Sequence, residues 1–403
     1  MKLPIIAICI LSFFALHLKA QNKPASATEK YEIGVYYFPN YHLDKRNEKH
    51  FTKGWSEWKL VKEAKPRFEG HQQPKVPLWG YTDEADPKQM AQKIKAASSN
   101  GITAFIFDWY YYDDGPFLER GLEEGFMKAS NNNLMKFSLM WANHDWTDIH
   151  PYTAGTNQNL LYPGKTTPAT WDKMTDYIIA KYFKHPSYWK IDGCPYFSIY
   201  DLGKFLESFG STELAAKALS DFRTKAKTAG FKDLNINAVV WGSTILPGEK
   251  NVADPNRIVK ELGFNSVTDY VWIHHVALAQ FPTTAYDSVK NEYFKYALSA
   301  ATNLNVPYYP NVSMGWDSSP RTNPAKPWGN SGYPYTPVIT GNTPVAFEKA
   351  LTEAKVFMDT HLKGTKILTI NSWNEWTEGS YLEPDTKNKM GYLKAIKAVF
   401  GHK

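Results

Sequence analysis

A short segment near the C-terminal end of the chain, NSWNEWTEGSYLEP at 371–384, places two glutamates three residues apart, directly after an apolar run. Residues at this spacing point to opposite faces of a regular strand, so Glu375 and Glu378 converge only if the chain turns between them. Gly379 favours such a turn, and on a helical turn the two Cβ atoms would lie roughly 5–6 Å apart. Carboxylates this close repel each other, which raises one pKa and suits that group for general-acid catalysis.

Two tryptophans, Trp373 and Trp376, stand beside these acids. Indole rings exclude water from neighbouring carboxyls, and they stack on sugar faces while their N–H groups donate hydrogen bonds. The whole chain is rich in such rings, with 15% aromatic residues, including 14 Trp and 25 Tyr. An aromatic wall beside a carboxylate pair fits the cleavage of glycosidic bonds. The alternative interpretations are a solvated acidic turn that caps the next helix and a large aromatic core.

Eight apolar runs rich in β-branched and aromatic residues recur along the chain, and each predicts a β-strand. They occupy residues 33–41, 102–110, 136–146, 195–201, 236–243, 266–275, 306–317 and 366–376. Most are separated by helical patterns, at 86–100, 118–129, 171–182 (with Thr170 as the expected N-cap), 211–230, 254–262, 285–303 and 344–362. Eight strands that alternate with helices predict a parallel sheet closed into a (β/α)8 TIM barrel of the α/β class. An open doubly wound sheet is the alternative, but no glycine-rich phosphate loop follows the first strand.

In such a barrel the active site lies at the carboxyl ends of the strands, and polar and aromatic residues gather at one predicted strand end after another. We predict a shared cleft there, with Glu375 and Glu378 as its catalytic residues. The expected substrate-binding residues are Tyr37, Asp108, Trp109, Asn143, His144, Asp145, Trp146 and Trp376. The Asp and His side chains are expected to bind sugar hydroxyls, the tryptophans to form subsite walls, and Tyr37 to lie at the cleft floor. Core packing is the alternative for each tryptophan.

The adjacent histidines His274 and His275 raise the question of a metal site. Neighbouring residues on a strand point to opposite faces, and no third ligand accompanies them. We therefore predict no metal requirement, and we expect no other cofactor.

The first twenty residues have the pattern of a secretory signal peptide. A basic start at Met1-Lys2 precedes an apolar run from Pro4 to Leu16, and the polar sequence after Ala20 indicates the cleavage site. This run is too short to span a bilayer comfortably, which argues against a membrane anchor. We expect a secreted or periplasmic protein with a signal peptide at 1–20, a polar leader at 21–30 and a single catalytic domain at 31–403 without a membrane span.

Charge and cysteine content argue against several classes of protein. The formal net charge is +6, with basic and acidic residues interspersed, whereas nucleic-acid binding needs a clustered basic stripe. Without the signal peptide only Cys194 remains, so no disulfide can form within the chain, and a cysteine nucleophile is not expected. We predict a monomer whose partner is a glycan or polysaccharide substrate.

Three segments resemble glycoside hydrolase family 99 and its relatives, especially the WbsX-like group. They are YYFPNYHLD with GWSEWKLVKEAKPRFEGHQQPKVPLWGY (36–81), GITAFIFDWYYYDDG with LMWANHDW (101–115 and 139–146), and NSWNEWTEGSYLEPD (371–385). The resemblance reaches from near the start of the expected mature chain to near its end, with a looser match in the middle. It implies a (β/α)8 barrel that acts on glycans with retention of configuration. Characterised relatives cleave inside α-mannosidic chains.

By this match Glu378 is the general acid/base, and Glu375 is the base that assists attack of the sugar 2-hydroxyl on the anomeric carbon. The resulting 1,2-anhydro sugar needs no enzyme nucleophile, which differs from the usual two-carboxylate scheme. One departure bears on the substrate. Well-studied members have a Trp-Tyr-Gly type segment after the first strand, where this chain reads FPNYH at 38–42. Mannose specificity is therefore open.

We expect an exported, endo-acting glycoside hydrolase. One alternative is a non-catalytic glycan-binding protein on the same scaffold, which the loss of either carboxylate would have favoured. Another is a glycosyltransferase, a label that some WbsX-like proteins carry. Nucleotide-sugar donors are cytoplasmic, so the expected export of this chain argues against that activity.

Overall fold

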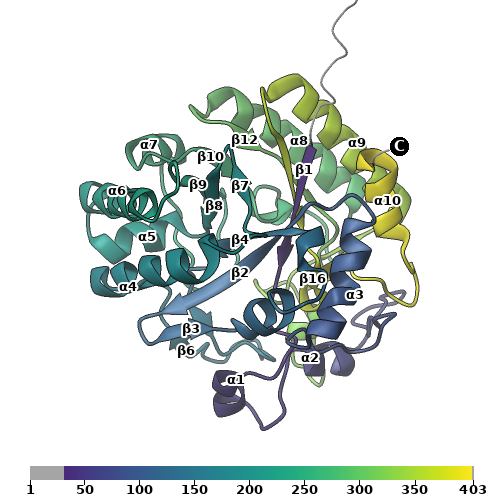
Figure 1. Cartoon of the computed structure of the whole chain (residues 1–403). Helices are drawn as coiled ribbons and strands as arrows, with labels where there is room; N and C mark the ends of the chain where they lie inside the picture. The colour runs from purple at the N-terminus through teal and green to yellow at the C-terminus, as the bar shows by residue number, and fades with distance from the viewer. Residues whose placement is uncertain (1–30, 402–403) are drawn as a thin grey trace, which may run out of the picture. The chain divides into compact units, whose positions relative to one another are not determined.

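The computed structural model describes residues 31–401, and a ring of parallel strands forms its centre (Figure 1). The strands of the ring are β1 (Tyr31–Tyr37), β2 (Ala104–Tyr112), β4 (Lys136–Trp141), β8 (Cys194–Ile199), β9 (Asn235–Val239), β10 (Ser266–Thr268), β12 (Tyr308–Tyr309), β13 (Asn311–Ser313) and β15 (Lys366–Asn371). Each of the eight predicted strand segments overlaps at least one of them. Their apolar runs are nearly continuous because both faces of a parallel barrel sheet are buried.

The seventh strand segment closes the ring, and Pro310 divides it in two. β12 pairs with β10, whereas β13 pairs with β15, so the two halves lie at the two ends of the path of paired strands. Proline has no N–H to donate to a strand ladder, which accounts for the break. Its carbonyl still accepts a 3.0 Å hydrogen bond from the Thr369 N–H. The predicted (β/α)8 barrel is confirmed.

Helices cover the outside of the ring (Figure 1). They are α3 (Pro87–Ser98), α4 (Pro168–Ile178), α5 (Leu202–Phe209), α6 (Thr212–Thr228), α7 (Pro255–Glu261), α8 (Tyr286–Asn303), α9 (Pro344–His361) and α10 (Gly391–Phe400). Six of these match helical patterns in the sequence, while α5 and α10 have no counterpart there. The segment predicted as a helix at 118–129 contains only a short π-helical turn, Gly121–Phe126.

A polar residue followed by proline begins four of the helices. The capping side chains belong to Asp86, Thr167, Asp254 and Thr343, each of which accepts a hydrogen bond from a backbone N–H of the first turn. The cap satisfies an otherwise unpaired N–H, and proline at the first position has none to satisfy. The predicted cap of α4 is wrong by one turn. Thr170 is not the cap, and it donates its N–H to the Thr167 hydroxyl at 3.2 Å.

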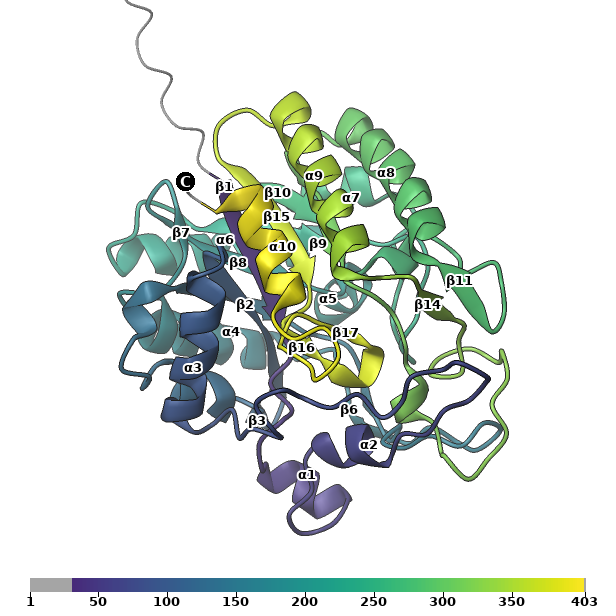
Figure 2. The ribbon, with the colours of Figure 1, turned by 90° about the vertical axis from the view of Figure 1, so that its right-hand side faces the viewer.

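Long connections gather over one end of the barrel, opposite the start of β1 (Figure 2). The β1–β2 connection carries α1 (Lys45–His50) and α2 (Trp58–Glu63), and a second long loop follows β13. Arg67 joins the two, because its guanidinium donates to the carbonyls of Thr322 and Asn323 at 3.3 and 2.9 Å. These connections also hold the short strands β3 (Gly115–Phe117), β5 (Trp146–Thr147), β6 (Leu160–Tyr162), β11 (Thr283–Ala285), β14 (Val338–Thr340), β16 (Asn374–Glu375) and β17 (Ser380–Tyr381). At the other end of the barrel, β7 (Lys190–Ile191) pairs with the start of β8.

The first strand and the last helix meet at the other end of the barrel. The ring centroids of Tyr31, in β1, and Phe400, in α10, lie 5.5 Å apart. Within residues 31–401 no helix combines the length and apolar character needed to cross a bilayer. The predicted signal peptide and leader fall at 1–30, outside the described residues.

Candidate active site

The segment with the two glutamates folds back on itself just after β15. β16 pairs antiparallel with β17, and a 3₁₀ turn at Trp376–Glu378 joins them. The turn expected between Glu375 and Glu378 is therefore present. Gly379 follows it with a φ of +64°, and a Cβ built there would lie 2.6 Å from the Cβ of Asp317. Both the backbone conformation and the available space thus require glycine.

A buried group of side chains, which we call the Glu383 clamp (Glu383, Lys93, Trp373 and Trp376), holds this turn from behind. Glu383 accepts hydrogen bonds from both indoles, at 3.1 Å from Trp373 Nε1 and 2.7 Å from Trp376 Nε1. The Lys93 ammonium, on α3, lies 2.7 Å from the same carboxylate, with its side chain fully buried. The two tryptophans therefore fix the direction of the turn, which places the neighbouring glutamates.

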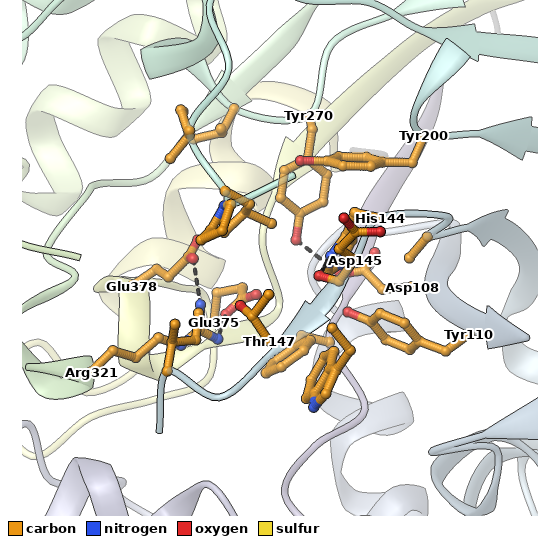
Figure 3. A pocket seen from close by; sticks show the side chains of 18 of the residues that line it. Asp108, Tyr110, His144, Asp145, Thr147, Tyr200, Tyr270, Arg321, Glu375 and Glu378 are labelled. Atoms are coloured by element: carbon orange, nitrogen blue, oxygen red, sulfur yellow. Dashed lines mark hydrogen bonds and ion pairs between the residues drawn. The ribbon is translucent and has the colours of Figure 1, made fainter. Parts of the chain in front are cut away.

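The glutamates face a pocket at the carboxyl ends of the strands. Figure 3 shows Arg321 beside Glu375 and Glu378, and Asp108, Tyr270 and Tyr110 on the facing side. Aromatic and histidine side chains supply much of the remaining wall, namely Phe38, Trp146, His144, His150, Tyr200, His274 and Trp316. The mixed polar and aromatic lining suits a sugar ring with its hydroxyls.

Arg321 bridges three buried carboxyl groups. Its Nη1 donates to Oε1 of Glu378 at 2.5 Å, and its Nη2 lies 3.5 Å from Oε2 of Glu375. Its Nε donates to Oε1 of Glu57 at 2.9 Å. The Tyr333 hydroxyl contacts Nη1 and donates to Oε1 of Glu378 at 2.9 Å. One guanidinium thus sits at the centre of a cluster with more negative than positive groups.

Burial and neighbouring charges shift the acidity of this cluster. Burial, followed by the charge of Glu378, raises the pKa of Glu375 well above its ordinary value. Burial also raises the pKa of Glu378, while Arg321 acts in the opposite direction. For Glu57, burial acts upward but the charge of Arg321 and further hydrogen bonds outweigh it, so the pKa is lowered. The glutamate pair therefore holds a proton more readily than exposed carboxyls, as general-acid catalysis requires.

A further carboxyl, Asp108, lies in the facing wall. Its Oδ2 accepts a 2.8 Å hydrogen bond from the Tyr270 hydroxyl, and its Oδ1 has no hydrogen-bond partner within residues 31–401. Burial raises the pKa of Asp108 well above its ordinary value. A protonated carboxyl there would offer an O–H donor, in addition to its acceptor oxygens, to a sugar hydroxyl.

The structure brings some of the predicted substrate-binding residues to the pocket and leaves others outside it. Asp108, His144, Asp145 and Trp146 line the pocket. The other four do not line it. The Tyr37 hydroxyl accepts a hydrogen bond from Lys93, and Trp109 Nε1 donates one to the Tyr182 hydroxyl. Asn143 exchanges two 2.8 Å hydrogen bonds with the backbone of Asp201, and Trp376 belongs to the Glu383 clamp. Those four contact neighbouring elements of the fold behind the pocket wall.

Two of the pocket-lining residues differ in how free they are to bind a ligand. The Asp145 carboxylate already accepts hydrogen bonds from Lys204 Nζ at 2.9 Å and from the Gly164 N–H at 2.8 Å. Burial lowers the pKa of His144 to about 4, so its imidazole is neutral at pH 7. A neutral imidazole can donate or accept a hydrogen bond with a sugar hydroxyl.

Several residues of the cluster were not among the sequence-based candidates. Tyr110 and Tyr200 stand at the ends of predicted strands, so the rule that selected Asp108 applies to them as well, whereas Tyr270 lies inside the predicted strand at 266–275. Arg321 lies in a long loop after β13, and its partner Glu57 precedes α2. The two are 264 residues apart in sequence, and no spacing rule connects them.

The adjacent histidines point to different neighbours. His274 lines the pocket, whereas Nε2 of His275 lies 3.0 Å from Oδ1 of Asp269. In the part of the chain that the structure describes, no group of three or more His, Cys, Asp or Glu side chains is arranged to hold a metal ion.

Comparison with known proteins places this barrel in a family. The model of the family described as "Glycosyltransferase WbsX" matches residues 33–396. Among curated proteins, WxcX of Xanthomonas campestris pv. campestris is 24% identical over 377 residues, in each of two strains. That match covers 90% of this chain and 48% of WxcX, so the chain spans about half the length of its curated relatives.

Two solved structures share the fold over most of their length. One is the GH99 endo-α-mannosidase from Bacteroides thetaiotaomicron, with a TM-score of 0.52 and 14% identity over 92% of this chain and 97% of that one. Another is a glycoside hydrolase-like protein, with a TM-score of 0.58 and 15% identity over 93% and 95%. Since the family match runs from β1 into α10, the chain belongs to the WbsX family and has a barrel fold like that of glycoside hydrolase family 99.

Proposed function

We propose that this chain is an exported glycoside hydrolase that cleaves glycosidic bonds within a polysaccharide or glycan and retains the anomeric configuration. The observation that carries the proposal is the pair of buried carboxyls, Glu375 and Glu378, held on either side of Arg321 at the mouth of the barrel. Glycosidases use two carboxyl groups of different acidity across one bond. The opposite wall offers Asp108, Tyr270 and His144 as partners for sugar hydroxyls.

In the proposed reaction Glu378 acts as general acid and protonates the leaving oxygen. Glu375 removes the proton of the sugar 2-hydroxyl, whose oxygen attacks the anomeric carbon as the glycosidic bond breaks, giving a 1,2-anhydro sugar. Water then opens this intermediate, with Glu378 as the base and Glu375 returning the proton to the 2-oxygen. Two inversions give net retention. The route needs a 2-hydroxyl trans to the leaving group, as in α-mannosides.

The end of the first strand bears on which sugar fits. Phe38 lines the pocket, and Asn40 donates to the Glu57 carboxylate that supports Arg321. This is the segment where the chain departs from the Trp-Tyr-Gly type sequence of well-studied family 99 members. α-Mannans are therefore the first substrates to test, alongside polysaccharides built from other sugars.

A glycosyltransferase is the second candidate, because the family description carries that name. A nucleotide-sugar donor brings a diphosphate, which proteins bind with cations or with backbone N–H groups at a helix start. Among the described residues that line the pocket, Arg321 is the only one with a permanent positive charge, and carboxylates already engage it. This arrangement favours the hydrolase.

The test compares the mature chain from Gln21 with Glu378→Gln and Glu375→Gln on a panel of α-mannans and other polysaccharides, with product configuration followed by NMR. Glu261→Gln is the matched control, since Glu261 pairs with Arg257 on the exposed side of α7. We expect cleavage with retention by the wild type and the control, and none by the two pocket variants. Glycan binding without cleavage would indicate a binding protein, and turnover only with a nucleotide sugar would indicate a transferase.

A further inference from the structure

The contacts of Arg321 with the two glutamates are unequal. Its Nη1 lies 2.5 Å from Glu378 Oε1, within charge-assisted hydrogen-bonding distance, whereas its Nη2 lies 3.5 Å from Glu375 Oε2. The Tyr333 hydroxyl donates to the same Glu378 oxygen at 2.9 Å. In contrast, Glu375 Oε2 is buried and has no hydrogen-bond partner within residues 31–401.

The far side of the guanidinium is fixed by Glu57. This carboxylate accepts from Arg321 Nε at 2.9 Å and lies 2.8 Å from Nη2, and it also accepts from the Thr377 hydroxyl at 2.5 Å. Its side chain is fully buried. Arg321 is therefore anchored by a carboxylate that does not line the pocket. Its Nη1 and Nη2 atoms lie towards Glu378 and Glu375.

An ionised carboxylate is stabilised by donors and a cation, while a buried carboxyl without either keeps its proton. We propose that Arg321 is a positioning residue that sorts the single proton of the pair: it keeps Glu378 ionised and leaves the proton on Glu375 while the pocket is free of substrate. The catalytic meaning of this arrangement rests on the proposed function, in which Glu378 must donate a proton to the leaving group.

The free pocket is then one proton transfer away from its reactive state. One proton leaves Glu375 and one arrives on Glu378, so the total charge of the pair stays the same. As a sugar fills the pocket, the guanidinium of Arg321 would move from Glu378 towards Glu375. Its charge would then stabilise an ionised Glu375, as it stabilises an ionised Glu378 in the free pocket. Substrate binding would in this way protonate Glu378, the acid, and ionise Glu375, the base, in one step.

Other groups face the pair and share in its titration. From the connections, they are Glu57, Tyr41, His150 and Tyr333; from β2 and the segment after β10, they are Asp108, Tyr110 and Tyr270. Burial raises the pKa of each tyrosine well above its ordinary value, and burial lowers that of His150 to about 4. Near pH 7 the four tyrosines and His150 stay neutral, so the charged or titrating groups beside the pair are Arg321, Glu57 and Asp108, whose pKa burial raises.

The test is a pH titration of substrate-free protein whose glutamate side-chain carboxyls carry ¹³C, followed by NMR. Glu375→Gln and Glu378→Gln each remove one signal and so assign the pair. In the wild type we expect the Glu378 signal to show the ionised state at a lower pH than the Glu375 signal. In Arg321→Gln we expect the Glu378 midpoint to move to higher pH and the order of the two to be lost. Arg321→Lys keeps the positive charge but not the two-pronged guanidinium, so its titration midpoints should lie between those of the wild type and those of Arg321→Gln.

Arg67→Gln is the matched control, because Arg67 holds the same loop through the carbonyls of Thr322 and Asn323 but contacts neither glutamate. A purely structural role of the loop would move the midpoints in this control as well. Ionisation of Glu375 before Glu378 in the wild type, unchanged midpoints in Arg321→Gln, or equal shifts in Arg67→Gln would each overturn the proposal. The titration needs no substrate, so a failure of the proposed hydrolysis would be seen separately.

Discussion

The buried ion pair between Lys93 and Glu383 allows a direct test of how the turn bearing Glu375 and Glu378 is held. Lys93→Met would leave the Glu383 carboxylate buried with two indole N–H donors and no cation. Glu383→Gln would leave a fully buried ammonium beside the Tyr37 hydroxyl, 3.2 Å away. Removing one member of a buried pair typically costs about 3–5 kcal/mol, because the remaining charge has lost its partner. We expect each single variant to lose roughly that much free energy of unfolding.

The assay is urea denaturation followed by tryptophan fluorescence, with Lys93→Met, Glu383→Gln and the double variant measured together. The double variant leaves no uncompensated charge, so its cost should fall short of the sum of the two single costs by about 0.5–3 kcal/mol. Lys217→Met is the matched control, since Lys217 forms an exposed pair with Asp221 on α6. Its expected cost lies between about 0 and 1 kcal/mol.

The reasoning would be refuted if the single variants lost no more stability than Lys217→Met, or if the two costs were simply additive. Either result would mean that the carboxylate and ammonium do not depend on each other in the folded protein. The turn bearing Glu375 and Glu378 would then be held by ring packing, such as the 3.8 Å stack of Trp376 on Tyr381.

Four further predictions concern Glu378, Gly379, Glu249 and the cleavage of the signal peptide. Glu378→Gln should slow glycan cleavage by about 10²–10⁴-fold, the usual contribution of a general acid, with an unchanged circular dichroism spectrum; a smaller loss would move the acid role elsewhere. Gly379→Ala should destabilise the protein by at least about 1–3 kcal/mol in urea denaturation, because its φ is +64° and Asp317 fills the space; a neutral result would contradict this account of the turn. Burial raises the pKa of Glu249 from 4.5 to about 8, so between these values the folded protein keeps a proton that the unfolded chain releases. The stability of the wild type relative to Glu249→Gln should therefore be highest below about pH 4.5 and fall as the pH rises towards 8, and a flat difference in melting temperature would exclude this. N-terminal sequencing of protein recovered from the periplasm or medium should begin at Gln21, and a chain beginning at Met1 would refute the proposed signal cleavage.

Elements buried on both faces were the most predictable from sequence. The eight strand segments stood out because barrel strands carry apolar residues on both sides. By contrast, α10 begins at Gly391 without a side-chain cap, so no start signal precedes it. The helix α5 begins just after β8, and its cap, Asp201, also fits the pattern of a polar residue at the end of a predicted strand. Its eight residues are shorter than the window of roughly 11–18 residues in which a helical pattern is recognised.

The candidate site was predictable only where a local rule applied. Asp108 lies in β2 and His144 just beyond the end of β4, near the carboxyl ends of the barrel strands, where barrel enzymes place their functional groups, and both line the pocket. Trp109 neighbours Asp108 on β2, and alternation along the strand turns its ring to the outer face, where it meets Tyr182. The role of Arg321 depends on a contact across 264 residues with Glu57, and such pairing through space leaves no trace in spacing or composition.

The ring contact between Tyr31 and Phe400 makes the barrel a suitable subject for circular permutation. A linker of a few residues would join the start of β1 to the end of α10, on the side opposite the long connections (Figure 2). New ends could be opened at 230–233, a partly exposed loop between α6 and β9. Every strand pairing would be kept, so the order in which the strands leave the ribosome could be changed while the pocket stays the same. Attachment to a surface at Tyr31 or Phe400 would likewise leave the long connections at the opposite end of the barrel facing outwards.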